Sequence, residues 1–418
     1  MDLTNQIPLG RCKVFPISKV GETMNSQKNK HFISAVLLLA ITQVVGCTSE
    51  SDDQASVNNT GKSDTTANKI SGTFKSSYDT RVFYSTEMMP SSQVYGRKAN
   101  GCSQQYNDYY FEAANTLVFG NPNLPESDFK QVATWVENNF DSALGAMQIT
   151  KGDYFSHRYA IRLDGLKYIR NNLAYKQYDS VSYPSEFDNW NYEQQVDWAT
   201  KTTKNMDTAQ AVGLLVNDPY SPFQTESEAV LEDKLYVCIH ETNTTNGWGE
   251  GNLVGINVGA PSIAVPHEAD KIVKHEIIHT IQYALTANFE ELGLPRWFSE
   301  GQAVLLSGMN VVHKSQHNEC DPTLVVYYSD EIGDQATAYS HYGLAYQYLK
   351  DANGQSSIIS FMKDVKQVTY DFSKQLNSPL EEYHGYVEAF DKSMKQLNGA
   401  PLSVEQYRYD YHSLLTDY

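Results

Sequence analysis

The chain contains 418 residues, of which 32 are basic and 50 are acidic, so its net charge is −18. This excess of acidic residues argues against a function in which the protein binds the phosphate backbone of a nucleic acid. It favours solubility and leaves the class of substrate open.

The N-terminal region has the pattern of a bacterial lipoprotein signal peptide. Lys28 and Lys30 precede an apolar stretch at 32–45, and Gly46 stands directly before Cys47. The apolar stretch is too short to span a bilayer as a mature helix. In such signal peptides the cysteine is lipidated and becomes the first mature residue, so we expect Cys47 to carry a palmitate-type anchor. An ordinary secretory signal peptide and a lone anchor helix are the alternatives.

The surroundings of this cysteine also predict a location. Thr48 follows it, and not an Asp, which predicts a lipoprotein of the outer membrane that faces the periplasm or the cell surface. Residues 1–23 form an unusually long polar lead, so we expect translation to start at Met24. No later stretch is apolar enough to cross a membrane.

Composition divides the chain into five segments. Ser, Thr, Asp and Asn dominate after the lipidated cysteine, which is typical of a flexible tether, and aromatic residues become frequent only later. The expected segments are a signal region at 1–47, a tether at 48–70, an N-terminal extension at 71–104, a main domain at 105–395 and a C-terminal tail at 396–418.

Three cysteines remain after the lipidated one, and an exported protein can hold disulfides. Cys102 and Cys320 stand in polar, loop-like surroundings, which predicts a disulfide between them. Cys238 stands within an apolar run, which predicts a buried thiol.

Several segments of the main domain have the periodicity of regular structure. Residues 128–146 carry apolar side chains at helical spacing. Residues 158–163, 235–239 and 253–258 predict strands, because they are short runs rich in apolar residues. The last two are separated by a turn-rich loop at 246–252.

A further helix is predicted at 270–287, and it contains the sequence HEIIH. Its two histidines, His275 and His279, are four residues apart and therefore project from one side of the helix, where they can bind one metal ion. Glu276 is in reach of a water on that ion. The opposite side is apolar, so we expect it to pack on a core while the histidines face a cleft. The apolar side consists of Val273, Ile277, Ile278, Ile281, Ala284 and Leu285.

A catalytic zinc takes three protein ligands and keeps one position for water, so a third ligand is expected downstream. No further histidine follows at short spacing, the next being His313. Glu300 is the better candidate, within the sequence RWFSEGQA at 296–303. Pro295 suits the first turn of a helix there, and Gly301 is small enough to let two helices approach closely. A solvated helix carboxylate or a partner of the helix dipole is the alternative for Glu300.

The HExxH pattern, followed about twenty residues later by W-x-x-E-G-x-A, resembles the gluzincin metallopeptidases, which are thermolysin-like and often called peptidase MA-like. The resemblance is tight over residues 270–305. It implies that His275, His279 and Glu300 bind one Zn²⁺ per chain. It also implies that Glu276 is the general base.

The resemblance extends more loosely over 105–395, so that segment is expected to be a gluzincin-like catalytic domain. It implies an α+β, thermolysin-like, two-lobed core, in which a mixed sheet and the zinc helix precede a mainly helical lobe. It also implies that the strand before the zinc helix, at 253–258, is an edge strand that pairs with an extended substrate. A core strand is the alternative for this run. Many gluzincins carry an Asp that orients a zinc-binding histidine where this chain has Val304.

A helix is also predicted from Tyr339 to Gly354. Gluzincins commonly use a Tyr or His from this region to stabilise the oxyanion of the tetrahedral intermediate. The resemblance makes Tyr342 and His341 candidates for that catalytic role. A role of both aromatic side chains in the core is the alternative.

Together these features predict a zinc peptidase that acts on peptide or protein substrates and is anchored in the outer membrane. Two alternatives remain open. The first is a non-catalytic surface lipoprotein that retains a zinc site, although Glu276 is intact. The second is a zinc amidase that hydrolyses amides of the cell wall.

Overall fold

The computed structural model describes residues 70–80, 82, 108–120, 122–156, 163, 166–167, 170, 181–203, 233–240, 249–251, 255–263, 268–286, 293–326, 330, 335–365 and 383–418. The predicted signal region, the lipidation site at Cys47, the tether before residue 70 and Cys102 lie outside these residues. Within the described residues, no helix combines the length and the apolar character needed to cross a bilayer.

Six strands of the described residues form one mixed sheet. They are β1 (Thr73–Ser76), β2 (Tyr109–Glu112), β3 (Thr116–Gly120), β4 (Leu235–His240), β5 (Gly249–Gly251) and β6 (Gly255–Gly259). The order across the sheet is β1-β2-β3-β4-β6-β5. Strands β3, β4 and β6 are parallel, whereas the pairs β1–β2, β2–β3 and β5–β6 are antiparallel. The mixed sheet confirms the α+β class, and β1 joins the beginning of the predicted N-terminal extension to the same sheet.

The edge of the sheet differs from the prediction. The run at 253–258 was expected to form the edge strand, but β6 lies between β4 and β5. The loop predicted at 246–252 contains β5, which pairs with β6 in a register that sets Glu250 opposite Asn257. Pairing with β6 thus makes a strand of a segment with little strand propensity, and among the described strands β5 ends the sheet.

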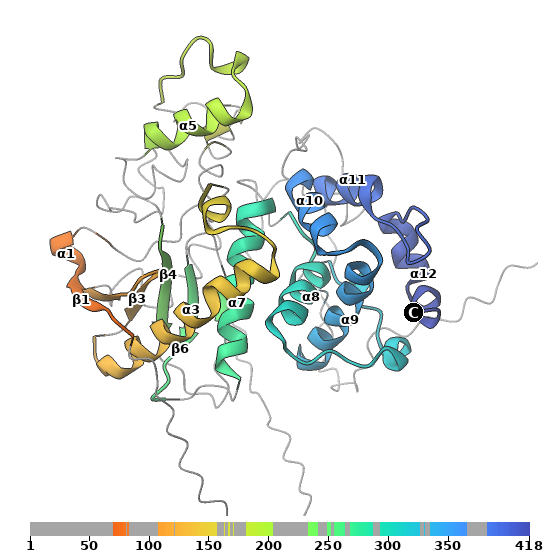
Figure 1. Cartoon of the computed structure of the whole chain (residues 1–418), viewed down its shortest axis with the longest axis horizontal. Coiled ribbons are helices and arrows are strands. Elements are labelled where there is room, and N and C mark those ends of the chain that lie inside the picture. Colours follow the sequence, from red (N-terminus) through yellow and green to blue (C-terminus); the bar gives the residue numbers. More distant parts are fainter. Residues whose placement is uncertain are drawn as a thin grey trace, which may run out of the picture.

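One face of the sheet is covered by two helices, α3 (Glu126–Ala146) and α7 (Ala269–Thr286), which also pack against each other (Figure 1). Alternate residues of a strand point to opposite faces. Val237 and Ile239 belong to the core beneath the helices, whereas Tyr236 and Cys238 belong to a smaller apolar cluster. The helices predicted at 128–146 and 270–287 are thus confirmed.

The apolar side of α7 is buried as predicted. Its members are Val273, Ile277, Ile278, Ile281, Ala284 and Leu285, and each is fully buried. A fully buried Val, Leu or Ile contributes about 1.5–3 kcal/mol of transfer free energy, so this side fixes the rotation of α7 about its axis. His275 and Glu276 are buried as well. His275 also lies 3.0 Å from Glu300 of the helix at 296–307, so part of the polar side of α7 faces that helix, and the cleft expected there stays a prediction.

The chain after residue 293 is mainly helical, and its helices lie on the far side of α7 from the sheet (Figure 1). They are α8 (Arg296–Ser307), α9 (Gln335–Asn353), α10 (Gln355–Val365), α11 (His384–Ser393) and α12 (Val404–Thr416), with short 3-10 segments at Lys314–Glu319 and Pro322–Leu324. The segment predicted as a C-terminal tail at 396–418 contains α12, whose Tyr407 and Tyr411 are buried in the core.

Helices α8 and α9 approach closely at Gly301. A Cβ atom built on Gly301 would lie 2.3 Å from the backbone oxygen of Tyr342, in α9. The prediction that Gly301 permits close helix packing is consistent with this contact. Helix α8 then ends at Gly308, whose φ of 80° is the left-handed conformation that terminates many helices.

A small separate part of the structure surrounds α5 (Tyr192–Thr203). Leu163, Phe187 and Ala199 belong to its own apolar cluster. Leu163 is helical, so the strand predicted at 158–163 is wrong at this residue, and its other residues lie outside the described part. Other short helical segments include α1 (Ser77–Thr80), a 3-10 turn at Phe187–Asn189 and the residues 151–156.

The cysteines differ in part from the prediction. Cys238 is disulfide-bonded, so the free buried thiol expected there is wrong. Cys320 is also disulfide-bonded. An apolar strand position predicts burial, which is correct, but it gives no information about a bonding partner distant in sequence. The pairing of Cys320 with Cys102 stays a prediction.

Four buried tyrosines of helices α9, α11 and α12 predict that the folded protein loses stability at alkaline pH. Burial raises the pKa of each of them. They are Tyr346, Tyr386, Tyr407 and Tyr411. An acid whose pKa is raised by folding keeps its proton in the folded state while the unfolded chain loses it, so stability is full below the unfolded pKa of about 10 and falls as the pH rises further. We expect the unfolding free energy to decrease from pH 9 to pH 11, as measured by denaturant titration.

A matched control is available for this expectation. The Tyr411 hydroxyl has no hydrogen-bond partner within the described residues. Tyr411→Phe should therefore preserve stability at pH 8 and weaken its dependence on alkaline pH. Equal unfolding free energies of the wild type at pH 9 and pH 11 would contradict the expectation.

Candidate metal centre

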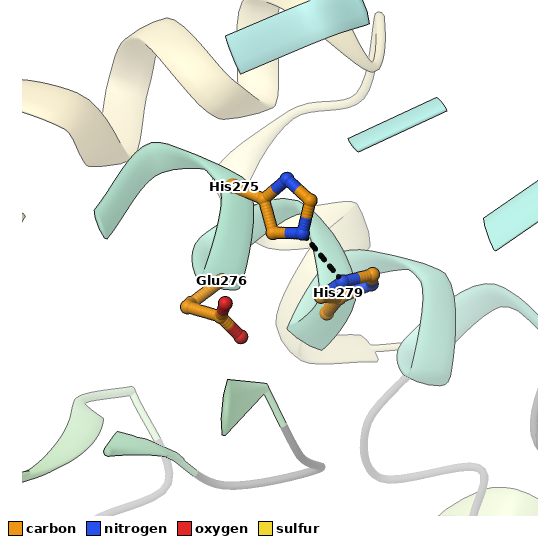
Figure 2. Close-up of side chains that lie close together, drawn as sticks. All are labelled: His275, Glu276 and His279. Carbon is orange, nitrogen blue, oxygen red and sulfur yellow. Dashed lines mark hydrogen bonds between the residues drawn. The ribbon is translucent and has the colours of Figure 1, made fainter. Parts of the chain in front are cut away.

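Helix α7 brings two imidazole rings together. His275 and His279 are one helical turn apart, and Figure 2 shows their rings meeting on one side of the helix, with Glu276 beside them. The two Nε2 atoms are 3.0 Å apart, and the rings are nearly perpendicular, at 86°. Helix periodicity alone accounts for this juxtaposition.

Helix α8 contributes the third side chain. Pro295 precedes its first residue, and Glu300 follows in the second turn. Oε2 of Glu300 lies 3.0 Å from Nε2 of His275 and 3.3 Å from Nε2 of His279. The structure therefore brings the three predicted zinc ligands into one triangle of donor atoms.

The size of this triangle suits a zinc ion. Zinc bound tetrahedrally at about 2.0–2.1 Å from each ligand holds its donor atoms about 3.3 Å apart. The observed separations are 3.0, 3.0 and 3.3 Å. The three side chains are only 4%, 13% and 5% exposed for His275, His279 and Glu300, so water does not separate them. Two imidazoles and one carboxylate are also a ligand set that zinc prefers.

Two carboxylates adjoin the histidines, and they differ in their relation to a metal. Glu276 has a carboxylate oxygen within 4.8 Å of a ring nitrogen of each histidine. Glu300 is closer, at 3.3 Å or less from both. Oε2 of Glu300 completes the triangle, so Glu300 fits the third ligand position more closely than Glu276, which lies adjacent to the triangle.

Arg296 binds one of the two carboxylate oxygens of Glu300. Its Nη1 donates to Oε1 of Glu300 at 2.5 Å. Oε2 is thereby left for the metal, and the carboxylate is fixed in orientation by a charge-assisted hydrogen bond from its own helix. Sequence reasoning did not single out Arg296, although a spacing of four residues on a helix predicts such a contact.

The electrostatics of the centre favour a positive charge. Burial lowers the pKa of His279, but the charge and hydrogen bond of Glu300 outweigh it and raise that pKa to about 9. Burial raises the pKa of Glu300, but the charges of His279 and Arg296 hold that pKa well below its usual range. Burial lowers the pKa of His275. A carboxylate beside two imidazoles thus attracts a cation, either a proton or a metal ion.

Tyr339 is a residue of this centre that sequence reasoning missed. Its ring stacks on that of His275, with centroids 6.0 Å apart and an angle of 7°. Its hydroxyl accepts hydrogen bonds from Nη2 of Arg296 at 2.7 Å and from Nε2 of Gln335 at 2.9 Å. Helix α9 begins at Gln335, before the predicted start, and this places Tyr339 within the helix, one turn before the chosen candidate Tyr342.

The two predicted oxyanion donors lie deeper in the helical lobe. Tyr342 is fully buried, and its ring centroid lies 5.8 Å from that of Tyr339. His341 is also buried, and neither of its ring nitrogens has a hydrogen-bond partner within the described residues. Burial lowers the pKa of His341. A catalytic role of either residue stays a prediction.

Val304 occupies the position where many gluzincins carry an orienting Asp. It is buried and faces α9, because its Cγ1 lies 3.0 Å from where a Cβ on Gly343 would be. Nδ1 of His275 has no hydrogen-bond partner among the residues that the structure describes. Val304 thus stands where the gluzincin pattern has an Asp, and Nδ1 of the buried His275 has no carboxylate partner among the described residues.

Comparison with protein-family models, with curated protein sequences and with solved structures gave no match. The donor-atom geometry and the sequence motifs are the features that point to a metal centre.

Proposed function

We propose that this protein is a zinc-dependent peptidase that holds one Zn²⁺ per chain between His275, His279 and Glu300. The observation that supports this proposal most directly is the triangle of donor atoms, with sides of 3.0, 3.0 and 3.3 Å. The resemblance of the two motifs to those of gluzincins supports the same proposal and, with it, a thermolysin-like core.

The proposed chemistry assigns one role to each side chain. Zinc held by His275, His279 and Glu300 would lower the pKa of a bound water and would polarise the carbonyl oxygen of the substrate. Glu276 takes a proton from the attacking water as the water oxygen bonds to the carbonyl carbon. The same carboxyl group then gives a proton to the amine nitrogen as the C–N bond breaks. Tyr339 joins Tyr342 and His341 as a candidate hydrogen-bond donor to the oxyanion, because it adjoins the centre.

The position of the sheet edge supports a peptide as the substrate. Strand β5 contacts α7, the helix that carries Glu276, and bonds to β6 on one side only among the described strands. An extended peptide can add to such an edge by main-chain hydrogen bonds. The edge expected at 253–258 is thus replaced in this proposal by Gly249–Gly251.

One experiment separates this proposal from its alternatives. The purified protein is analysed for metal content and incubated with a proteome-derived peptide library and with cell-wall amides. We expect about one zinc per chain and cleavage of peptides at defined positions. Cleavage of cell-wall amides alone would identify an amidase. Bound zinc without either activity would identify a non-catalytic zinc protein, and the absence of bound zinc would contradict the proposal as a whole.

The proposed location is the outer membrane, with the lipid of Cys47 as the anchor. The basic residues, the short apolar stretch and Gly46 before Cys47 support it. Metabolic labelling with a palmitate analogue is expected to tag the full chain, and Cys47→Ala is expected to abolish the label. Cys12→Ala is the control, because this cysteine precedes the expected start at Met24. Labelling that persists in Cys47→Ala would contradict lipidation at this site.

A further inference from the structure

A line of buried polar groups leads from the metal centre through four helices. Nδ1 of His279 lies 2.7 Å from Oε1 of Gln282, and Nε2 of Gln282 donates to Oε1 of Gln302 at 2.9 Å. Nε2 of Gln302 donates to the Tyr346 hydroxyl at 2.9 Å, and that hydroxyl donates to Oε1 of Gln355, also at 2.9 Å. We name Gln282, Gln302, Tyr346 and Gln355 the amide relay. Its members belong to α7, α8, α9 and α10 in turn.

The direction of the relay is fixed by a backbone carbonyl. Nε2 of Gln282 also donates to the carbonyl oxygen of Ser299 at 2.8 Å. A carbonyl oxygen can only accept, so the NH₂ group of Gln282 must lie at this end of the amide. Its Oε1 therefore faces His279, and Nδ1 of His279 must be the donor. The lone pair of the neutral ring is thereby left on Nε2, the atom that faces His275 and Glu300.

The rest of the relay keeps Gln282 in this orientation. Gln302 is fully buried, and its amide is held between Gln282 and Tyr346. A half-turn of the Gln302 amide would set its NH₂ group against the NH₂ group of Gln282, which would then keep only the carbonyl oxygen of Ser299 as an acceptor. Buried amides that lose their partners are costly, so each member stabilises the orientation of the one before it.

We propose that Gln282 is a positioning residue for the metal ligand His279 and that the amide relay holds it in place. This inference rests on the proposed zinc centre and adds to it a determinant of metal affinity. Gln282 orients the ring and fixes its tautomer, and as a neutral amide it brings no second negative charge to the centre. Metal affinity is in this way coupled to the packing of α8, α9 and α10 against α7.

The test measures zinc affinity in the full chain by competition with a chelator. Gln282→Leu removes the acceptor for Nδ1 of His279, and we expect its zinc dissociation constant to rise by about 10- to 100-fold. Tyr346→Phe removes only a distant link, so a smaller rise is expected. The absorption spectrum of the Co²⁺-loaded protein should shift in Gln282→Leu, because it reports the geometry of the ligands. Gln282→Glu retains an acceptor for Nδ1 but cannot donate to Ser299 or Gln302, so its loss of affinity should be smaller than that of Gln282→Leu.

A matched control separates positioning from general destabilisation. Gln195, on α5, is also buried and donates to the carbonyl oxygen of Phe187 at 2.8 Å. Gln195→Leu makes the same chemical change outside the centre and should leave zinc affinity and the cobalt spectrum unchanged. Equal zinc affinity of Gln282→Leu and the wild type would overturn the inference, as would equal losses in the two Leu variants.

Two further outcomes are informative. If Gln282→Leu fails to fold, Gln282→Glu and Tyr346→Phe decide. A measurable loss of affinity in both would support the relay, because each variant removes one of its hydrogen bonds, and near wild-type affinity in either would overturn it. A wild-type protein that binds no zinc would overturn the proposed function together with this inference. Zinc binding that is insensitive to the relay would overturn the inference alone.

Discussion

Glu276→Gln is expected to retain about one zinc per chain and to lose nearly all turnover, with kcat/KM lower by about 10²- to 10⁴-fold, the usual contribution of general-base catalysis. An amide cannot accept the proton of the attacking water, yet it has the size and shape of the carboxylate. Because Glu276 is buried beside the histidines and outside their donor triangle, the fold and the metal should both persist. The measurement pairs peptide cleavage with elemental analysis.

Glu300→Ala is the contrasting variant. It removes one donor of the triangle and leaves Arg296 without its carboxylate partner. Both zinc and activity should therefore be lost. A Glu276→Gln protein that cleaves peptides at the wild-type rate with zinc in place would show that the proposed mechanism is wrong.

Gly301→Ala is expected to destabilise the protein and to weaken zinc binding. The added methyl group would lie 2.3 Å from the backbone oxygen of Tyr342, which cannot move unless α9 moves with it. Overpacking of this kind typically costs about 1–3 kcal/mol, and a clash with backbone belongs at the upper end. Glu300 is the preceding residue of α8, so a shift of this helix also disturbs the donor triangle. Denaturant unfolding and zinc competition measure the two effects.

Gly145→Ala is the matched control for that variant. Gly145 is exposed near the end of α3, and no atom lies within 4 Å of the Cβ that Ala would add. The same substitution should there be neutral or stabilising, by up to about 1 kcal/mol, because Ala restricts the unfolded chain. If Gly301→Ala were as stable as Gly145→Ala, the close approach of α8 and α9 would not matter energetically.

The sequence predicts the local parts of the centre well. Helix α7 follows from the spacing of its apolar residues, and the proximity of His275 and His279 follows from a four-residue spacing, so neither depends on distant parts of the chain. Glu300 could be predicted as the third ligand because it stands in a second local motif, W-x-x-E-G-x-A. Its distance from the histidines, however, depends on how α8 crosses α7, which no local pattern encodes.

The features that sequence reasoning missed are contacts between elements. The contact of Tyr339 with His275 was not predicted, because it depends on the rotation of α9 against α7. Gln282 was missed because a glutamine inside an amphipathic helix has no pattern of its own. Strand β5 was assigned to a loop, since pairing with β6 overrides the weak strand propensity of Gly-Glu-Gly.

The pairing of β3 with β4 has a consequence for the order of folding. Thr116 and Leu235 are partners across 119 residues, whereas His275 and Glu300 meet across only 25. Closing the longer loop costs about 1.4 kcal/mol more entropy if both are treated as flexible chains. Refolding should therefore form the metal-binding pair of helices before the parallel strands join, and zinc added early would act on a chain whose sheet is still incomplete.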